Sequence, residues 1–250
     1  MKTTNECCGA DRNVAGNGRR AWLKASAGTA VAIAGLGLRA DDAEAASLSK
    51  AQRDALTPDR IIDLMKKGNA RFRSGKMLPH DYIAQKRSSA GGQYPAAVIL
   101  SCIDSRAPAE IVMDMGIGDT FNARIAGNIS NKDVMGSLEF ACAVEGAKVV
   151  LVLGHTSCGA IKGAIDKVEL GNLTGLLEVI KPAVEGTTYT GERSSKNAQF
   201  VDMVARTNVK MTIDAIRSGS PVLADLEKKG NIKIAGAMYD LSNGLVTFLG

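Results

Sequence analysis

Two short apolar runs in the middle of the chain constrain its fold more than any other feature. Residues 96–100 and 149–153 contain only alanine, valine, isoleucine and leucine, a pattern typical of strands buried on both faces of a parallel sheet. Each run ends near residues that can bind a metal: Cys102 follows the first, and His155 and Cys158 follow the second. Because the carboxyl ends of parallel strands meet at one edge of a sheet, the pattern predicts that these three side chains form one site.

The predicted ligand set is two cysteines and one histidine. Three protein ligands with an open fourth position are typical of catalytic zinc, whereas structural zinc takes four. The chain has only two histidines, so the choice of imidazole is narrow. Cys158 opens a predicted helix, whose dipole favours the thiolate. We expect one Zn²⁺ per chain and a bound water whose pKa lies above about 7, the value given by three histidines, because thiolates donate more negative charge.

Asp104 and Arg106 come directly after the first ligand, with one residue between them. An arginine beside a carboxylate keeps the carboxylate ionised, so that it only accepts hydrogen bonds. Such an aspartate can accept a hydrogen bond from zinc-bound hydroxide and orient it. It can instead bind zinc as a fourth ligand and close the site. The sequence leaves both uses open.

Helical and strand patterns alternate along the rest of the chain. The expected strands are residues 96–100, 120–125, 148–153, 232–239 and 245–249, and the expected helices are residues 107–115 (helix or turn), 132–145, 158–168, 173–184 and 197–217. The Asn243-Gly244 pair between the last two strands is a hairpin signal. This order predicts an α/β fold with a mainly parallel sheet flanked by helices and an antiparallel strand at the C-terminus.

An N-terminal helical arm is expected before the sheet. Thr57-Pro58 predicts the start of a helix and Gly75 its end, with apolar residues on one face. Residues 76–93 are polar and are expected to be irregular.

The first 46 residues predict an export signal. Arg19-Arg20 precede an apolar stretch over residues 25–38, and Ala43-Glu44-Ala45 offers a cleavage site. The stretch is shorter than the ~20 residues that span a bilayer, so no stable membrane anchor is expected. The pattern resembles a twin-arginine signal, which divides the chain into residues 1–46 and one domain over residues 47–250. We expect a periplasmic or otherwise exported protein; the alternative is an uncleaved amphipathic arm.

The composition argues against a nucleic-acid partner and against a disulfide framework. The net charge is +5, and the ten aromatic residues do not cluster with basic residues, so a nucleic-acid partner is not expected. Three cysteines follow the predicted signal, an odd number that does not suit a disulfide framework. If two of them bind zinc, Cys142 is left as a small buried apolar group.

Cys-Ile-Asp-Ser-Arg at residues 102–106 and His-Thr-Ser-Cys-Gly at residues 155–159 resemble the two signature segments of the β-class carbonic anhydrases. The similarity extends from about residue 58 to residue 249. The resemblance implies a zinc lyase that interconverts CO2 and bicarbonate, with the cysteines and histidine named above as ligands and Asp104 with Arg106 as the orienting dyad. It also implies a homodimer or a dimer of dimers. The arm over residues 58–75 would then pack its apolar face on a neighbour.

Family position adds three residues to the predicted site. It implies that Gln93 hydrogen-bonds the substrate, that Phe121 forms a wall of the CO2 pocket, and that Gly159 keeps the pocket open. From the residues alone, Gln93 and Phe121 would be interpreted as a solvated loop residue and a core residue. His80 is either a proton relay or, in the simpler interpretation, a solvated loop histidine. Some relatives place a partner's tyrosine in the pocket, but no tyrosine occurs near Asn131.

Other functions remain to be weighed against CO2 hydration. The same site could hydrolyse a sulfur analogue such as CS2 or COS. A non-catalytic zinc-binding protein of the same fold is a further alternative, which the loss of Asp104 or Arg106 would have favoured, yet both are present. Thiol redox chemistry would use a Cys-x-x-Cys pair, and the chain has none.

Overall fold

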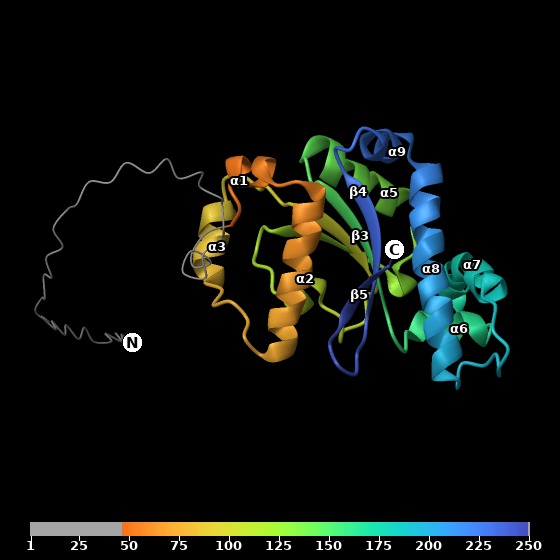
Figure 1. The fold of residues 1–250 in the computed structure, drawn as a ribbon. Helices are drawn as coiled ribbons and strands as arrows, with labels where there is room; N and C mark the ends of the chain where they lie inside the picture. Colours follow the sequence, from red (N-terminus) through yellow and green to blue (C-terminus); the bar gives the residue numbers. More distant parts are fainter. Residues whose placement is uncertain (1–46, 250) are drawn as a thin grey trace, which may run out of the picture. The chain divides into compact units, whose positions relative to one another are not determined.

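The chain folds around a five-stranded sheet with the strand order β2-β1-β3-β4-β5 (Figure 1). The computed structural model describes residues 47–249, so the predicted export signal lies outside the described residues. The first four strands are parallel, and the last is antiparallel to its neighbour, as the sequence predicts. The strands are β1 (Ala97–Ser101), β2 (Thr120–Arg124), β3 (Val149–His155), β4 (Lys233–Tyr239) and β5 (Val246–Leu249).

Helices cover both faces of the sheet, and the central strands send side chains to each. Val98 and Leu100 of β1 belong to one apolar cluster, and Ala97 and Ile99 belong to the other. Every residue of β1 and β3 is buried, as the apolar runs predict for central parallel strands. Between residues 47 and 249, no helix has both the length and the apolar character needed to cross a membrane.

The first cluster includes residues from α5 (Lys132–Glu139), η2 (Phe140–Val144), α6 (Gly159–Ile165), α7 (Gly171–Gly186), α8 (Ala198–Gly219) and α9 (Pro221–Lys228). The second includes residues from α2 (Pro58–Ser74) and α4 (Ala109–Val112). The remaining described elements are α1 (Lys50–Ala55), α3 (Tyr82–Ser89) and η1 (Ala126–Asn128).

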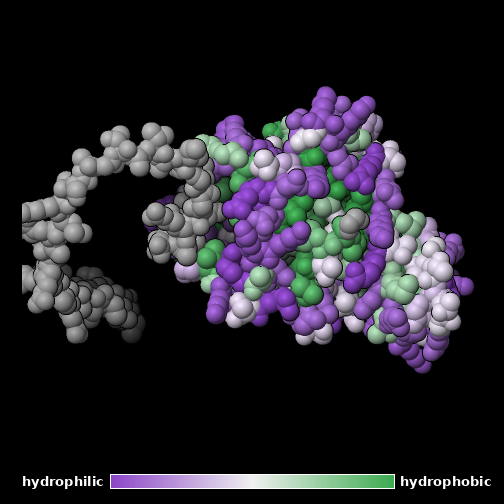
Figure 2. Space-filling model, in the orientation of Figure 1, coloured by the Kyte–Doolittle hydropathy of each residue, from purple (hydrophilic) through white to green (hydrophobic). Residues whose placement is uncertain are grey.

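Helix α2 begins and ends at the predicted residues, but its apolar face is covered within the chain. Thr57 accepts a hydrogen bond from a backbone N–H of the first turn, Pro58 is the first helical residue, and Gly75 ends the helix with φ 68°. Ile61 and Met65 are buried in the second cluster. The expectation that this face packs on a neighbour is therefore wrong, because the chain's own sheet covers it. Figure 2 shows hydrophilic residues on the outer side of α2.

Helices α1 and α9 were not expected, and two further segments differ from the expected secondary structure. Residues 76–93 are not wholly irregular, because they contain α3; only Gln85 of this helix is buried, which leaves little apolar periodicity to detect. The helix expected over residues 132–145 is α5 followed by a π-helix, η2, that begins at Phe140. Neither difference moves the strands that carry the predicted ligands.

Candidate metal centre

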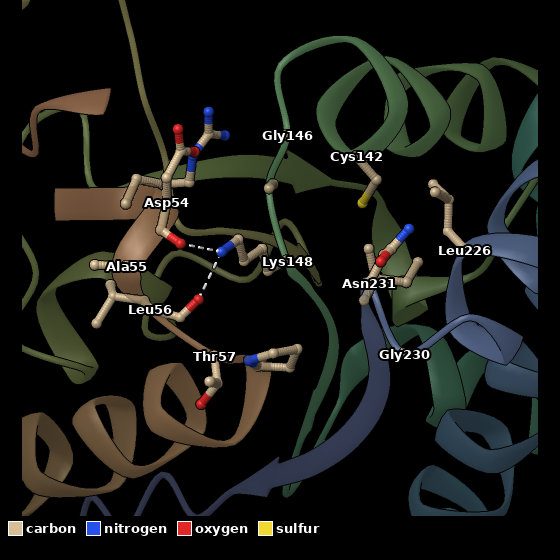
Figure 3. A pocket seen from close by; sticks show the side chains of 14 residues that line it. Asp54, Ala55, Leu56, Thr57, Cys142, Gly146, Lys148, Leu226, Gly230 and Asn231 are labelled. Carbon is tan, nitrogen blue, oxygen red and sulfur yellow. Dashed lines mark hydrogen bonds and ion pairs between the residues drawn. The ribbon is translucent and has the colours of Figure 1, made fainter. Parts of the chain in front are cut away.

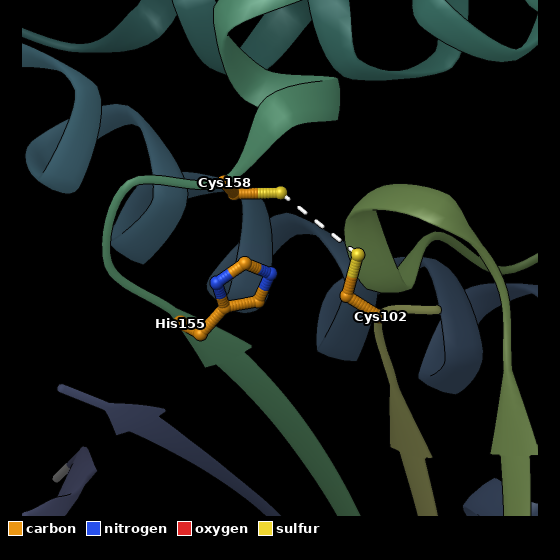
Figure 4. Close-up of side chains that lie close together, drawn as sticks. All are labelled: Cys102, His155 and Cys158. Carbon is orange, nitrogen blue, oxygen red and sulfur yellow. Dashed lines mark hydrogen bonds between the residues drawn. The ribbon is translucent and has the colours of Figure 1, made fainter. Parts of the chain in front are cut away.

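Three buried side chains from neighbouring strand ends converge into one cluster, which we call the metal centre (Figure 4). Cys102 follows β1, His155 is the last residue of β3, and Cys158 directly precedes α6. Their potential ligand atoms all lie within 4.8 Å of one another. The Sγ atoms of the two cysteines are 4.0 Å apart. The structure therefore brings together the three residues that the sequence predicts as zinc ligands.

The metal centre lies where the connections of the sheet diverge. After β1 the chain passes through α4 to β2 on one side, and after β3 it passes through α6 to α9 and reaches β4 on the other side. Ser101 of β1 is in register with Leu153 of β3, so the two strands end at nearly the same level. In parallel sheets, ligands bind outside the carboxyl ends of the strands at such a switch point. The topology thus explains how cysteines 56 residues apart meet.

His155 turns one ring nitrogen toward the two sulfur atoms (Figure 4). Nδ1 lies 2.9 Å from the carbonyl oxygen of Thr156 and must donate to it, so the lone pair of a neutral ring is on Nε2. Nε2 is buried and has no hydrogen-bond partner among residues 47–249. An unpaired buried acceptor is costly. A lone pair beside two thiols is the donor set of a zinc site, so the residues fit this metal.

The two thiols favour a single negative charge when no cation is present. The thiol of Cys158 hydrogen-bonds to the sulfur of Cys102 and lowers the pKa of Cys102 to about 4. The backbone N–H of Gly127 also donates to this sulfur, at 3.3 Å. The hydrogen bond with Cys102, together with burial, raises the pKa of Cys158. A second thiolate would therefore require a bound cation.

Asp104 and Arg106 form a two-point ion pair beside the metal centre. Arg106 donates from Nε at 2.9 Å and from Nη2 at 2.7 Å to the two carboxylate oxygens. These bonds hold the pKa of Asp104 well below its usual range. Oδ2 of Asp104 lies 3.9 Å from Nε2 of His155. The carboxylate is thus next to the cluster while it is bound to arginine.

The backbone around Cys102 is held by an arginine whose role the sequence did not suggest. Arg124, the last residue of β2, donates from Nε to the carbonyl of Cys102 at 2.9 Å and from Nη2 to the carbonyl of Asp104 at 2.6 Å. Its register partner in β1 is Ser101. A basic residue at the penultimate position of the strand predicted over residues 120–125 was the available signal.

The three residues added by family position lie in different places. Gly159 is exposed at the start of α6, directly after Cys158, and a Cβ added there would meet nothing within 4 Å, so the space beside this residue is open. Phe121 pairs in register with Val98, which places it about 13 Å along the strand from the level of Cys102. Gln93 is exposed and precedes the amino end of β1. The structure does not bring Phe121 or Gln93 to the metal centre of the same chain.

His80 belongs to a separate buried network. Its Nε2 lies 2.9 Å from Oδ1 of Asp114, and Arg71 also donates to that carboxylate. The side chain of His80 is only 8% exposed, so the interpretation as a solvated loop histidine is wrong. Its ring is bound to Asp114 rather than to the metal centre, and the relay role gains no support.

Known proteins resemble this chain in both sequence and fold. The carbonic anhydrase family model matches residues 97–246, which include the metal centre, Asp104 and Arg106. The chain is 34% identical over 186 residues to carbonic anhydrase 2 of Mycobacterium tuberculosis, covering 72% of this chain and 87% of that protein. It is 34% identical over 184 residues to carbonic anhydrase of Mycolicibacterium smegmatis, covering 73% and 88%.

Solved structures agree with this assignment. A tetrameric β-carbonic anhydrase of Sordaria macrospora is 25% identical, with a TM-score of 0.57, over 64% of this chain and 83% of that chain. A Coccomyxa β-carbonic anhydrase in complex with acetazolamide has the same fold, with a TM-score of 0.58 at 23% identity over 76% and 82% of the two chains. The chain therefore belongs to the β-class carbonic anhydrase family.

Proposed function

We propose that this protein catalyses the reversible hydration of CO2 to bicarbonate and a proton, with one Zn²⁺ bound by Cys102, His155 and Cys158. The observation that carries the proposal is the buried Nε2 of His155, which has no hydrogen-bond partner in the described part of the chain and faces two thiols beside an ionised carboxylate. A zinc ion supplies the Lewis acidity that makes water nucleophilic near neutral pH. The sulfur separation of 4.0 Å is close to the ~3.8 Å that two Zn–S bonds of about 2.3 Å span at a tetrahedral angle.

The Asp104–Arg106 pair supports catalysis rather than metal storage. Because Arg106 keeps the carboxylate ionised, Asp104 accepts hydrogen bonds and cannot donate one. An acceptor at this place holds the proton of the attacking oxygen and directs its lone pair at the substrate. The open space beside Gly159 leaves room for a small uncharged molecule. A protein that only stores zinc has no use for this arrangement.

A second copy of the chain completes the substrate pocket in this proposal. Gln93 and Phe121 lie toward the amino end of the sheet, away from the metal centre of their own chain. Phe121 is on the edge strand β2 and stacks edge-on with Phe140, which is 46% exposed. This apolar edge is available to a partner, and the partner's metal centre would receive the two side chains. Light scattering at micromolar concentration tests it, because a monomer would contradict the assembly.

Export is proposed from the sequence of the first 46 residues. Arg19-Arg20, the apolar stretch after it and the small residues at positions 43–45 support a twin-arginine route to the periplasm. Cell fractionation of the full chain tests this, with Arg19→Lys/Arg20→Lys as the variant that should remain in the cytoplasm. An unchanged distribution of that variant would contradict the proposed route.

The deciding experiment is stopped-flow CO2 hydration from about pH 6.5 to about pH 9, with zinc measured on the same preparation. We expect turnover together with one zinc per chain. Zinc binding without turnover would favour the non-catalytic alternative. Hydrolysis of CS2 or COS in preference to CO2 would favour the sulfur-analogue alternative.

A further inference from the structure

Helix α8 approaches the backbone of the sheet directly beside the metal centre. Gly154 precedes His155 on β3, and a Cβ added there would lie 2.6 Å from a methyl group of Val209 on α8. A Cβ at Gly236 on β4 would lie 2.8 Å from the other methyl group of the same valine. Both strands therefore need glycine where the helix crosses them. This contact fixes α8 relative to the strand that ends at His155.

Asp202 of α8 bonds to the turn between two of the cluster residues. Its Oδ1 accepts a hydrogen bond from the backbone N–H of Ser157 at 3.0 Å. Ser157 stands between His155 and Cys158 and has a φ of 54°, in the left-handed region that serine rarely adopts. A carboxylate makes a stronger acceptor than a neutral group. Asp202 thus stabilises the turn that brings the imidazole and the second thiol to one point.

Asn208 of the same helix bonds to the loop that faces the other cysteine. Its Nδ2 donates to the carbonyl of Gly127 at 2.7 Å, and the side chain is buried. The N–H of Gly127 donates to Sγ of Cys102 at 3.3 Å. Gly127 has a φ of 70°, so its conformation also depends on its surroundings. Asn208 therefore holds the residue that hydrogen-bonds the first thiol.

We propose that α8 is a clamp for the metal centre, in which Asp202 and Asn208 are positioning residues that set the distance between its two halves. One half is the turn from His155 to Cys158, and the other is Cys102 with Gly127. The proposal rests on the proposed function, since it takes zinc as the ion that the centre binds. Both side chains act through backbone groups of other residues, so they change how firmly and with what geometry the metal is held.

The main test measures zinc affinity of Asp202 variants by competition with a chromophoric chelator. Asp202→Ala removes the acceptor, and the affinity should fall by ~10–100-fold, as for other groups that orient metal ligands. Asp202→Asn keeps an oxygen acceptor and should lose less than about ten-fold. Asp214→Ala is the matched control, because Asp214 is an exposed acid on the same helix, and its affinity should stay within about two-fold.

A suppressor variant separates positioning from general stability. Glycine adopts positive φ without strain, so Ser157→Gly in the Asp202→Ala background should recover most of the lost affinity. The cobalt(II)-substituted proteins give a second readout. The ligand-field and thiolate charge-transfer bands of Asp202→Ala should shift, and those of the double variant should return toward the parent spectrum. If Asp202 only stabilises the fold, neither the zinc affinity nor the cobalt(II) spectrum should recover in the double variant.

Asn208→Leu tests the other half of the clamp. It leaves the buried carbonyl of Gly127 without its donor, so zinc affinity should fall by ~10-fold or more. Thr212→Val is the control, one turn further along α8 and also buried, and it should retain the parent affinity within about two-fold.

The following results would overturn the clamp. Asp202→Ala and Asn208→Leu could bind zinc as tightly as their controls, or the folded double variant could show no recovery. If Asp202→Ala does not fold, Asp202→Asn with and without Ser157→Gly decides the same question, and again no recovery overturns it. A parent protein that binds no zinc, or a Cys102→Ser variant that binds it at full affinity, refutes the proposed function and the clamp with it.

Discussion

The two ends of the central strands differ in how their polar groups are satisfied. At the carboxyl ends, Nε2 of His155 has no hydrogen-bond partner within the residues that the structure describes. At the amino ends, a pocket of about 500 Å³ lies against polar groups that do have partners (Figure 3). There Lys148 donates to the carbonyls of Asp54 and Leu56 at 2.7 Å each, and Arg53 bonds to Asp54 at 2.8 Å. A hollow alone therefore does not mark the functional site; buried groups that still need a partner mark it.

The buried cysteines repeat the contrast. Cys102 and Cys142 have similar exposure, 4% and 5%. The sulfur of Cys102 is surrounded by hydrogen-bond donors and has a pKa lowered to about 4, whereas burial raises the pKa of Cys142 to about 12. Cys142 is thus an inert apolar group that lines the pocket, as the sequence predicts. Equal burial does not give equal chemistry, because the neighbouring donors decide which thiol ionises.

Exchanging cysteines gives the largest expected effect. Cys102→Ser and Cys158→Ser should each lose most of the zinc and more than ~100-fold of CO2 hydration, since even the groups that orient metal ligands are worth ~10–100-fold. Cys142→Ser is the control from the other end of the strands and should keep one zinc per chain and parent activity. Metal analysis and stopped-flow kinetics measure both. Zinc loss in Cys142→Ser would break the comparison.

Neutralising the carboxylate beside the metal centre should have the next largest effect. Asp104→Asn keeps the shape but removes the charge that Arg106 binds, so activity should fall by ~10–100-fold while zinc is retained. Asp225→Asn is the control, because it breaks an exposed ion pair with Lys229 and should change activity less than about two-fold. Parent activity in Asp104→Asn would remove the dyad from the mechanism.

The pH dependence of the CO2 hydration rate should reflect ionisation at the metal centre and not ionisation of Asp104. The hydrogen bonds with Arg106 lower the pKa of Asp104 in the folded protein. The carboxylate is therefore charged at every pH above the ordinary aspartate pKa, and it loses its charge only when the pH falls through the lowered pKa, far below the assay range. The rate should therefore fall about ten-fold per unit below a single kinetic pKa that lies above about 7. A kinetic pKa below about 6.5 contradicts the two-thiolate ligand set. Activity that vanishes already below about pH 8 indicates that Asp104 closes the site.

The sequence predicted the carboxyl ends of β1 and β3 better than the helices around them, because the residues that form these strand ends are close together in the sequence. Apolar runs followed at once by ligand residues fix both the strands and the site, so the three cluster residues were correctly placed together. Helix α9 carries the same start signal as α2, since Ser220 caps it and Pro221 follows, although no helix is predicted for these residues. Helix α3 also has an N-cap, Asp81, but no proline follows it. Its exposed apolar residues Tyr82 and Ile83 leave no apolar periodicity that would predict the helix.

Contacts between segments that are far apart in the sequence could not be predicted from it. Asp202, Asn208 and Arg124 each bond to backbone groups in other elements, and a backbone carbonyl or N–H leaves no mark in the sequence of its partner. The same limit explains the arm: the apolar face of α2 was visible, but the identity of the surface that covers it was not. A periodic pattern tells which face is buried and leaves open whether the chain itself or a neighbour buries it.

The smallest expected effect comes from the satisfied end of the strands. Lys148→Met keeps the apolar stem but removes the ammonium that joins the residue before β3 to two carbonyls at the C-terminal end of α1, so the free energy of unfolding should fall by ~1–2 kcal/mol. Because these carbonyls lie at the opposite end of β3 from His155, zinc content and kcat/KM should stay within about two-fold of the parent. Thermal unfolding and stopped-flow hydration on one preparation measure the two. If Lys148→Met lowers activity as much as Asp104→Asn does, the two ends are coupled, and satisfied hydrogen bonds no longer distinguish scaffold from site.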